Sequence, residues 1–371
     1  MTLEVRSPLA PMEALSVDDI PEGVRWQYEP KWDGFRCIAF RDGAKIELQS
    51  KASQPLARYF PEVVAALAQL GAKRFVLDGE IAVPTGGNFS FDALLQRIHP
   101  AASRVKRLAA ETPAIYVVFD LLADENGKSL LCRPLSERRA HLEKFAAAQF
   151  EKGGSVHLSP ATTKLTQAKK WLTQTGATLD GIIAKRRDLD YRTAERDGMQ
   201  KIKNFRSADC VIGGFRYGSK TKVVGSLLLG LYSADGLLNH VGFTSGIAAA
   251  DRPALTKKLE KLIAGPGFTG SAPGGASRWS KGKEDTWQPL KPELVIEVQY
   301  DHATGNRFRH GTKLLHWRPD KSPRQCTMDQ LTQKTSDLRK LLEERPLIRL
   351  AKIRGCNPRH AWDLRPTATE R

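Results

Sequence analysis

The sequence changes character after residue 205, and this change limits the possible folds more than any other feature. In residues 1–205, apolar segments of strand length alternate with helical segments and loops, which is typical of a mixed α+β domain. In residues 206–330, short β-prone segments follow one another and are divided by Gly, Ser and Asp turns, as in a small β-barrel. We therefore expect two domains with these bounds, followed by a basic C-terminal tail, residues 331–371, that is partly helical or disordered.

Periodicity predicts the individual elements. The strands expected in the first domain are residues 26–40 on both sides of a turn at Lys31, 44–48, 75–83, 115–122, 182–185 and 200–203. The expected helices are residues 61–70, which Gly71 ends, and 136–149, which Ser136 caps. The strands expected in the second domain are residues 211–217, 226–233, 239–244 and 294–300. Residues 265–277 are expected to form a loop within that domain, and residues 329–345 favour a terminal helix.

Basic residues are in excess, mostly in the second half of the chain. The net charge of the 371 residues is +17, with a pI of about 9.7. Residues 206–330 hold +7 of this charge and residues 331–371 hold +5, so the first 205 residues hold only +5. This distribution favours a surface for a polyanion such as nucleic acid. A generally basic protein would have the same net charge, so charge alone leaves both interpretations open.

Composition and cysteine spacing exclude several classes of protein. Hydrophobic residues make up 41% and charged residues 27% of the chain, as in a soluble globular protein. No apolar run approaches the roughly 20 residues that span a bilayer, and the N-terminal residues lack a signal-peptide core, so we expect a cytoplasmic protein without a membrane partner. The five cysteines are far apart and the eight histidines lack ligand spacing, which argues against a disulfide framework or a zinc site.

The segment Lys31-Trp32-Asp33-Gly34-Phe35-Arg36, which follows Glu29-Pro30, combines groups that suit nucleotide chemistry. A lysine amine can form a covalent bond to phosphorus, and glycine lets the backbone approach a ligand closely. Free lysine has a pKa of about 10.4, so nearby cations or burial must lower it before the amine can attack. Alone, a K-x-D-G match is a weak signal, because four such residues recur by chance.

Downstream residues supply the other groups that nucleotidyl transfer needs. Lys201 and Lys203 are spaced so that both point to one face of a strand, where they add cations for phosphates. Glu80 and Asp180 offer carboxylates to Mg²⁺, which usually takes one or two carboxylates plus phosphate oxygens. Phe119, in an apolar strand, offers a ring face to a base. Each has an ordinary alternative: the lysines on a solvated strand face, and the phenylalanine in the core.

Together these segments resemble the motif set of the covalent nucleotidyltransferases, and most closely that of bacterial ATP-dependent DNA ligases. The matching segments, in chain order, are Lys31–Arg36, Ser50–Ser53, Leu77–Ile81, Tyr116–Asp120, Asp180–Lys185, Lys201–Lys203 and Arg318–Lys321. The compact members look most similar, namely the stand-alone ligase C type and the ligase domain of ligase D. The resemblance implies an α+β nucleotidyltransferase (adenylation) domain followed by an OB-fold β-barrel domain.

The resemblance also implies a role for each residue near the nucleotide. Lys31 would be the nucleophile that takes AMP, and Lys201 and Lys203 would hold the α-phosphate. Mg²⁺, or Mn²⁺ in its place, would be bound by Asp180 and Glu80, although the aspartate replaces the usual glutamate and is shorter by one methylene. The residues implied to bind the nucleotide itself are Glu29, Asp33, Arg36, Glu80 and Phe119.

Further residues are implied at the DNA and at the pyrophosphate. Ser50 and Lys51 would bind the 5′-phosphate of a nick, where lysine replaces the usual arginine and lacks its bidentate fork. Arg318, Asp320 and Lys321 would close over the triphosphate from the second domain and orient the departing pyrophosphate.

These roles predict an ATP-dependent DNA ligase that seals 3′-OH/5′-phosphate nicks or breaks in duplex DNA through a lysyl-AMP and a DNA-adenylate. The expected partners are ATP and nicked or broken duplex DNA, the expected state is a monomer, and the expected setting is DNA repair on the bacterial nucleoid. A link to end-joining proteins rests only on analogy with ligase D. The tail either extends the DNA footprint or is dispensable.

Two other functions remain as alternatives. A capping-type guanylyltransferase or an RNA ligase would share the lysine chemistry. A non-catalytic OB-fold binder would hold nucleic acid by charge and by stacking. The aromatic and basic residues that suit such a surface are Trp279, Lys281, Lys283, Trp287 and Trp317, and core packing is the ordinary role for each tryptophan.

Overall fold

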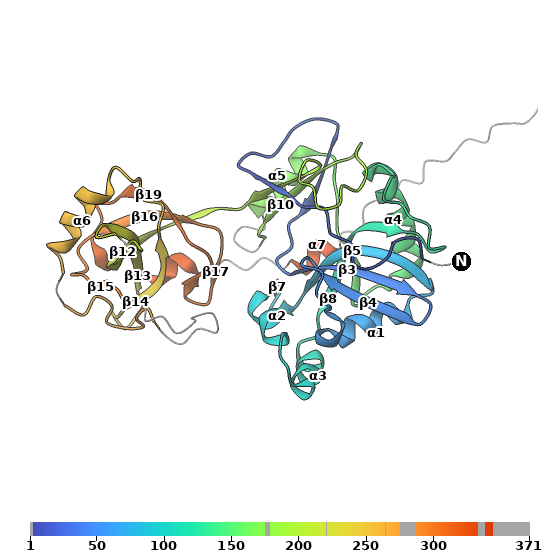
Figure 1. Cartoon of the computed structure of the whole chain (residues 1–371), viewed down its shortest axis with the longest axis horizontal. Helices are drawn as coiled ribbons and strands as arrows, with labels where there is room; N and C mark the ends of the chain where they lie inside the picture. The colour runs from blue at the N-terminus through green and yellow to red at the C-terminus, as the bar shows by residue number, and fades with distance from the viewer. Residues whose placement is uncertain are drawn as a thin grey trace, which may run out of the picture.

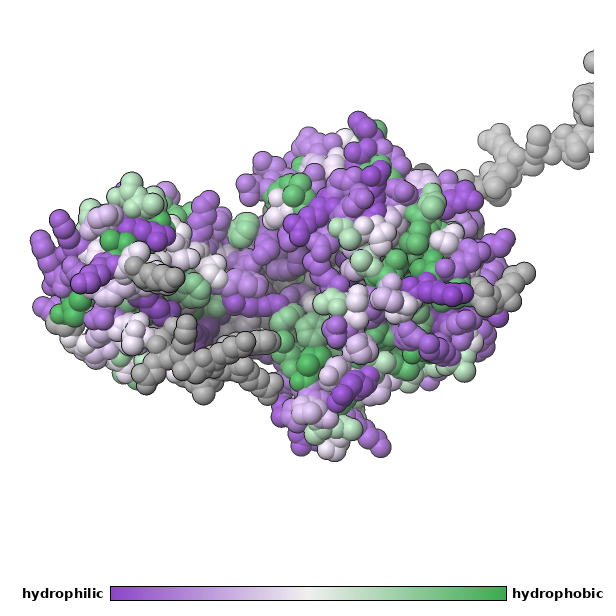
Figure 2. Space-filling view, viewed as in Figure 1, coloured by the Kyte–Doolittle hydropathy of each residue, from purple (hydrophilic) through white to green (hydrophobic). Residues whose placement is uncertain are grey.

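The computed structural model describes residues 3–174, 179–219, 221–263, 265–274, 286–332 and 338–343. Within these ranges the chain forms two lobes, and the chain passes from the first to the second at β12 (Arg206–Tyr217) (Figure 1). On the face drawn in Figure 2, hydrophilic residues cover most of both lobes. None of the helices in these ranges is long and apolar enough to cross a membrane.

The larger sheet of the first lobe has five strands in the order β4-β3-β5-β8-β9. Their bounds are β3 Phe35–Asp42, β4 Lys45–Ser50, β5 Arg74–Ala82, β8 Ile115–Ala123 and β9 Val156–Leu158. All pairs are antiparallel except β8 with β9. Helices α1 (Pro61–Gln69) and α4 (Leu135–Gln149) share a buried apolar cluster with this sheet. β8 is a nearly continuous apolar run and β5 is apolar on both sides of Asp78-Gly79-Glu80, which suits strands with both faces buried.

A smaller sheet of the first lobe has the order β1-β11-β10-β2. Its strands are β1 Leu15–Val17, β2 Trp26–Pro30, β10 Gly181–Arg186 and β11 Met199–Lys203, and helix α5 (Leu165–Gln174) lies against β2 and β10. β2 ends at Pro30 in this sheet, whereas β3 begins at Phe35 in the larger one. Residues 31–34 therefore cross between the two sheets. Gly34 makes the crossing feasible, because a Cβ there would lie 2.3 Å from the Ile81 carbonyl oxygen.

The second lobe is built mainly from antiparallel strands in the order β14-β13-β12-β16-β19, with β15 beside β12. The bounds are β13 Val224–Tyr232, β14 Leu238–Thr244, β15 Gln288–Pro289, β16 Val295–Tyr300 and β19 Lys313–Trp317. Helix α6 (Arg252–Glu260) packs on β13, and a short hairpin pairs β17 (Ala303–Thr304) with β18 (Arg307–Phe308). One apolar cluster forms the core of this lobe.

Short elements connect and extend the two lobes. In the first lobe they are η1 Ala57–Tyr59, β6 Pro84–Thr85, β7 Asn88–Phe89, α2 Phe91–Arg97 and α3 Ala102–Glu111. Helix α3 projects from the lobe, as Figure 1 shows. In the last part of the chain they are η2 Pro323–Gln325, η3 Met328–Leu331 and α7 Arg339–Glu343.

Every strand expected from periodicity is present, but two details were wrong. Helix α4 begins at Leu135, one residue early, and Ser136 does not cap it. The amides of Leu135 and Ser136 instead donate to the carbonyls of Leu189 and Arg187, so a neighbouring loop replaces the side-chain cap. The helix expected over 329–345 is not continuous, because Thr332 is extended (ψ 118°) at the end of η3. Residues 333–337 and 344–371 of the expected tail lie outside the described residues.

Candidate active site

A cavity of about 460 Å³ lies between the two sheets of the first lobe. This volume falls within the range of small-molecule sites. All of its lining residues come from the first lobe. The sequence-predicted site residues among them are Glu29, Lys31, Arg36, Lys51, Glu80, Phe119 and Lys201. Seven residues that are far apart in the sequence thus surround one space.

Lys31 stands where the chain leaves β2. Its backbone amide donates to the Gly181 carbonyl at 2.9 Å, which fixes the start of the crossing, and its Nζ forms an ion pair with Asp180. Burial lowers the pKa of Lys31, but the carboxylates of Asp180, Glu80 and Asp33 outweigh burial, and the net pKa is raised. The sequence-based expectation of a lowered pKa was therefore wrong for this state. The nearest charged neighbours of the amine are carboxylates, not the expected cations.

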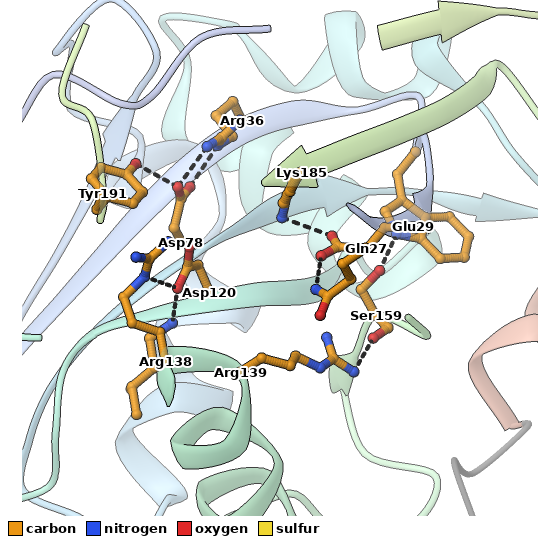
Figure 3. Close-up of polar contacts among 12 residues, drawn as sticks. Gln27, Glu29, Arg36, Asp78, Asp120, Arg138, Arg139, Ser159, Lys185 and Tyr191 are labelled. Carbon is orange, nitrogen blue, oxygen red and sulfur yellow. Dashed lines mark hydrogen bonds and ion pairs between the residues drawn. The ribbon is translucent and has the colours of Figure 1, made fainter. Parts of the chain in front are cut away.

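Arg36 is held at the floor of the cavity by a buried carboxylate. Its Nε and Nη2 each donate to Asp78 at 2.5 Å, and the Tyr191 hydroxyl donates to the same carboxylate at 2.7 Å (Figure 3). Asp78 has no exposed side-chain surface. Burial raises the pKa of Glu80 to about 8, and the cations of Arg36 and Lys31 oppose the shift.

A second buried network forms the wall of the cavity around Glu29. Gln27 Nε2 donates to one oxygen of this carboxylate and Lys185 Nζ to the other, both at 2.8 Å (Figure 3). Lys185 Nζ also lies 4.3 Å from the centroid of the Phe119 ring, and the Arg36 guanidinium lies 4.6 Å from it. The ring is thus an electron-rich surface that cations already approach.

Sequence reasoning assigned no role to Gln27, Asp78 or Lys185. Only the first of these carries a usable signal: it stands two residues before Glu29 on one strand, so the two side chains point to the same face. The pairing of β3 with β5 sets Arg36 opposite Glu80, and this pairing also depends on the tertiary structure and not on a local sequence pattern.

Two predicted site residues face the second lobe and do not line the cavity. Asp33 accepts two hydrogen bonds from Arg309 Nη1, both at 2.8 Å, and Lys203 Nζ lies 2.6 Å from Asp301. The Arg309 guanidinium also lies 3.4 Å from the centroid of the Phe91 ring. Residues around the β17–β18 hairpin therefore contact the first lobe directly, at Asp33 in the crossing segment and at Lys203 at the end of β11.

Of the two residues expected at the DNA, Lys51 lines the cavity and Ser50 precedes it at the end of β4. Lys51 Nζ is 3.1 Å from Glu13, whose other oxygen pairs with Arg196 at 2.8 Å. The side chain of Lys51 is 61% exposed, so solvent and a polyanion can reach it. Ser50 Oγ accepts a hydrogen bond from the Gln54 amide at 2.9 Å and closes the turn.

The predicted residues of the second lobe do not line the cavity. Arg318 Nη1 lies 2.9 Å and Lys321 Nζ lies 2.5 Å from the carboxylate of Asp209 on β12, and Arg318 also pairs with Asp320. Gln330 holds the backbone amide and carbonyl of Asp209. The three predicted residues thus lie together, but on the surface of their own lobe.

Asp180 and Glu80 offer hard oxygen ligands of the kind that Mg²⁺ prefers. Among the residues that the structure describes, no group of three or more His, Cys, Asp or Glu is arranged to hold a metal ion. The two carboxylates nevertheless fit an ion that completes its coordination with phosphate oxygens. Both interact with Lys31, so such an ion would share their charge with the amine.

The tryptophans of the second lobe have separate roles. Trp287 packs against the core of the lobe, with its ring 5.5 Å from that of Phe268. Trp317 is 37% exposed, and Lys258 Nζ lies 4.9 Å from its ring centroid. Trp279, Lys281 and Lys283 lie outside the described residues. Of the two expected tryptophans that the structure describes, Trp317 is exposed and Trp287 is half-buried.

Comparison with known proteins yields matches over most of the chain. The family described as "ATP dependent DNA ligase domain" matches residues 11–203, and that described as "ATP dependent DNA ligase C terminal region" matches residues 220–321. DNA ligase C2 of Mycolicibacterium smegmatis is 46% identical over 351 residues, covering 89% of this chain and 96% of that protein. DNA ligase C of Mycobacterium tuberculosis is 44% identical over 350 residues, with the same coverage of both chains.

A solved structure from work on Lig E DNA ligases shares the fold. It is 16% identical, covers 83% of this chain and 100% of its own, and has a TM-score of 0.52. Together with the two matching domains, it confirms the expected fold class, an adenylation domain followed by an OB-fold domain.

Proposed function

The chain belongs to the ATP-dependent DNA ligase family, and on this premise we propose that Lys31 receives AMP from ATP and that the cavity around it binds the nucleotide. The enzyme joins DNA at the expense of ATP and seals nicks between a 3′-hydroxyl and a 5′-phosphate. Family membership favours this activity over the capping, RNA-ligase and non-catalytic alternatives.

The observation that supports Lys31 most directly is its position at the crossing between the two sheets. The Lys31 side chain lines the cavity, and Phe119, Glu29 and Lys201 line the same cavity. We assign adenine to the side of Phe119 and Glu29, because an aromatic face stacks on a base and a carboxylate accepts from its amino group. Arg36 and Glu80 would contact the ribose, and Lys201 would contact the α-phosphate.

The reaction would proceed by three in-line displacements. First, the lone pair of Lys31 Nζ attacks the α-phosphorus, and the bond from this phosphorus to the pyrophosphate oxygen breaks. The amine must lose its proton, and the Asp180 carboxylate that it contacts is the nearest acceptor. Next, a DNA 5′-phosphate oxygen displaces the lysine from the AMP phosphorus. Finally, a 3′-hydroxyl attacks the DNA phosphorus and AMP leaves. Each step depends mainly on positioning and charge neutralisation.

Mg²⁺, or Mn²⁺ in its place, would be held by Asp180 and Glu80 and would neutralise charge on the phosphates. Ser50 and Lys51 would bind the 5′-phosphate of the nick. Asp33 and Lys203 would belong to the same site, although both contact the second lobe in this structure.

Arg318, Asp320 and Lys321 would reach the triphosphate only after the second lobe moves, because all three are absent from the cavity wall. Arg318 and Lys321 are paired with Asp209, and Asp320 is paired with Arg318. We further propose bounds of 1–205 for the adenylation domain and 206–330 for the OB-fold domain. A monomer is sufficient, since one chain supplies every residue of the cavity. The setting would be DNA repair on the nucleoid of a bacterial cytoplasm, and end-joining partners remain an analogy with ligase D.

The test is covalent labelling. Wild-type protein and Lys31→Ala are incubated with α-labelled ATP or GTP and Mg²⁺, separated on a denaturing gel, and chased with nicked duplex DNA. We expect label from ATP only, none in the variant, and its discharge as sealed DNA. Equal labelling of Lys31→Ala and wild type would show that another residue is the nucleophile. Circular dichroism of the variant checks that it is folded.

A further inference from the structure

The described end of the chain returns from the second lobe to the first. Leu331, at the end of η3, belongs to the core of the second lobe. Seven residues later, Leu338 is 3% exposed and belongs to a core cluster of the first lobe, together with Leu341 of α7. In Figure 1, α7 lies among the strands of the first lobe, far from the other elements of similar colour.

The cluster that receives α7 includes the neighbour of the catalytic lysine. Trp32 is 5% exposed and belongs to the same cluster as Leu338 and Leu341. Its indole Nε1 donates to Ser159 Oγ at 2.9 Å, and its ring meets that of Phe89 edge-on at 5.6 Å. The side chain next to Lys31 is thus held by packing on several sides.

Backbone contact fixes the same segment to a hairpin beside this tryptophan. The Leu338 amide donates to the Gly87 carbonyl at 2.8 Å, in the turn between β6 and β7. Phe89, which packs against Trp32, lies on β7. The segment therefore binds by a directed hydrogen bond as well as by apolar burial. Arg339 and Glu343 both act electrostatically on the half-buried His157 of β9.

We propose that Leu338 and Leu341 are positioning residues for the adenylation of Lys31. They complete the packing around Trp32 and so hold the crossing segment, and with it the amine, in the geometry needed for attack. This inference rests on the proposed role of Lys31 as the nucleophile. It assigns the segment 338–343 to the catalytic machinery, although it follows the OB-fold domain in the sequence.

The size of the effect follows from general physical principles. Burying apolar side chains is favourable, so two buried leucines suffice to keep a five-residue helix docked. Misplacing a reacting atom by 1 Å costs on the order of 10²-fold in rate. Loss of the support would therefore slow attack by Lys31 without removing any group that touches ATP.

The test compares Leu338→Asp/Leu341→Asp with Lys340→Asp, whose position on the same helix is exposed. Two reactions are measured at saturating ATP or DNA: adenylation of Lys31, and sealing of a nick that already carries AMP, which does not use the lysine as a nucleophile. We expect the double variant to adenylate about 10–100-fold more slowly, with the ATP KM changed less than about threefold. Sealing should stay within about threefold, and Lys340→Asp should match the wild type in both.

Further variants separate positioning from other causes. Leu338→Met/Leu341→Met keeps the apolar volume and should restore adenylation. A flexible 20-residue Gly/Ser insertion after Thr332 slackens the connection between the lobes and should leave adenylation unchanged. The inference would be overturned if the aspartate variant adenylated as fast as the wild type, or if its adenylation and sealing rates fell equally. It would also be overturned if the Gly/Ser insertion slowed adenylation as much as the aspartate substitutions do. Failure of the proposed function looks different, because wild-type protein would then not label or Lys31→Ala would.

Discussion

The two lobes hold their predicted functional cations in different ways. In the first lobe, Arg36 is tied to a fully buried Asp78 by two hydrogen bonds of 2.5 Å. In the second lobe, Arg318 and Lys321 share Asp209, whose side chain is 12% exposed, and their own side chains are 30% and 24% exposed, against 20% for Arg36 and none for Asp78. Breaking a fully buried pair leaves a desolvated charge, whereas water can replace part of a partner that is lost from a more exposed cluster. The proposed function therefore predicts that the first lobe keeps Arg36 on Asp78, whereas Arg318 and Lys321 exchange partners more readily.

The largest expected effect tests whether the two sets of cations serve different steps. Lys201→Ala removes a cation from the cavity wall and should slow both adenylation and the sealing of a pre-adenylated nick, by about 10²–10³-fold. Arg318→Ala should slow adenylation by a similar factor but leave sealing within about threefold. Single-turnover kinetics measure both steps. A comparable loss of sealing in Arg318→Ala would contradict the division of labour.

Stability offers the second test of the comparison. Asp78→Asn leaves Arg36 without its buried partner and should lower the free energy of unfolding by about 3–5 kcal/mol. Asp209→Asn is the matched change in the second lobe and should cost about 1 kcal/mol or less. Urea unfolding of both variants measures the difference. Equal losses would show that the second cluster is as firmly held as the first.

The core of the second lobe contains a histidine whose burial predicts a pH dependence. His240 is 4% exposed, and burial, followed by Arg307 and Arg216, lowers its pKa to about 4. Between this value and an unfolded pKa of about 6.5, the unfolded chain binds the extra proton, so stability rises with pH and is lost as pH falls. The loss should approach about 3 kcal/mol by pH 4.

His240→Gln should abolish that part of the pH dependence, whereas His316→Gln, at an exposed position, should retain it. Thermal unfolding between pH 4 and pH 7 gives the result. A wild-type profile unchanged by the first substitution would show that another group titrates.

The smallest effect concerns the mouth of the cavity. Lys51→Ala should weaken binding to nicked DNA only a few-fold, but lower the slope of log affinity against log salt by about 1, as for one lost phosphate contact. Lys45→Ala, at an exposed residue that pairs with Glu47, should leave the slope unchanged. Titrations at several salt concentrations measure both slopes. Equal slopes in wild type and Lys51→Ala would remove this residue from the DNA interface.

Local patterns predicted the elements of the site better than its contacts. Strands such as β5 and β8 are apolar runs with clear ends, so their positions follow from short-range sequence. Asp78, Lys185 and Arg309 belong to ion pairs with partners 42, 156 and 276 residues away, and no periodicity encodes such a pairing. For the same reason the pKa of Lys31 had the wrong predicted direction: its sign depends on Asp180, 149 residues later.

Helix ends show the same limit on a smaller scale. Serine is a favoured N-cap residue, yet the carbonyls of residues 187 and 189, and not the side chain of Ser136, accept from the first amides of α4. The docking of α7 also escaped prediction, because a short amphipathic segment gives no sign of which lobe it will join. Residues 338–343 look like part of a tail until the apolar surface that receives them is known.

Because Leu338 packs in the first lobe, the second lobe is synthesised between two parts of the first lobe. A ribosome completes β11 at Lys203 but must add 135 more residues before Leu338 is available to join the core cluster that contains Trp32. At typical elongation rates this takes on the order of 10 s. During that time the core cluster around Trp32 lacks its last apolar members. The segment next to Lys31 would thus reach its final packing only after the second lobe has been made.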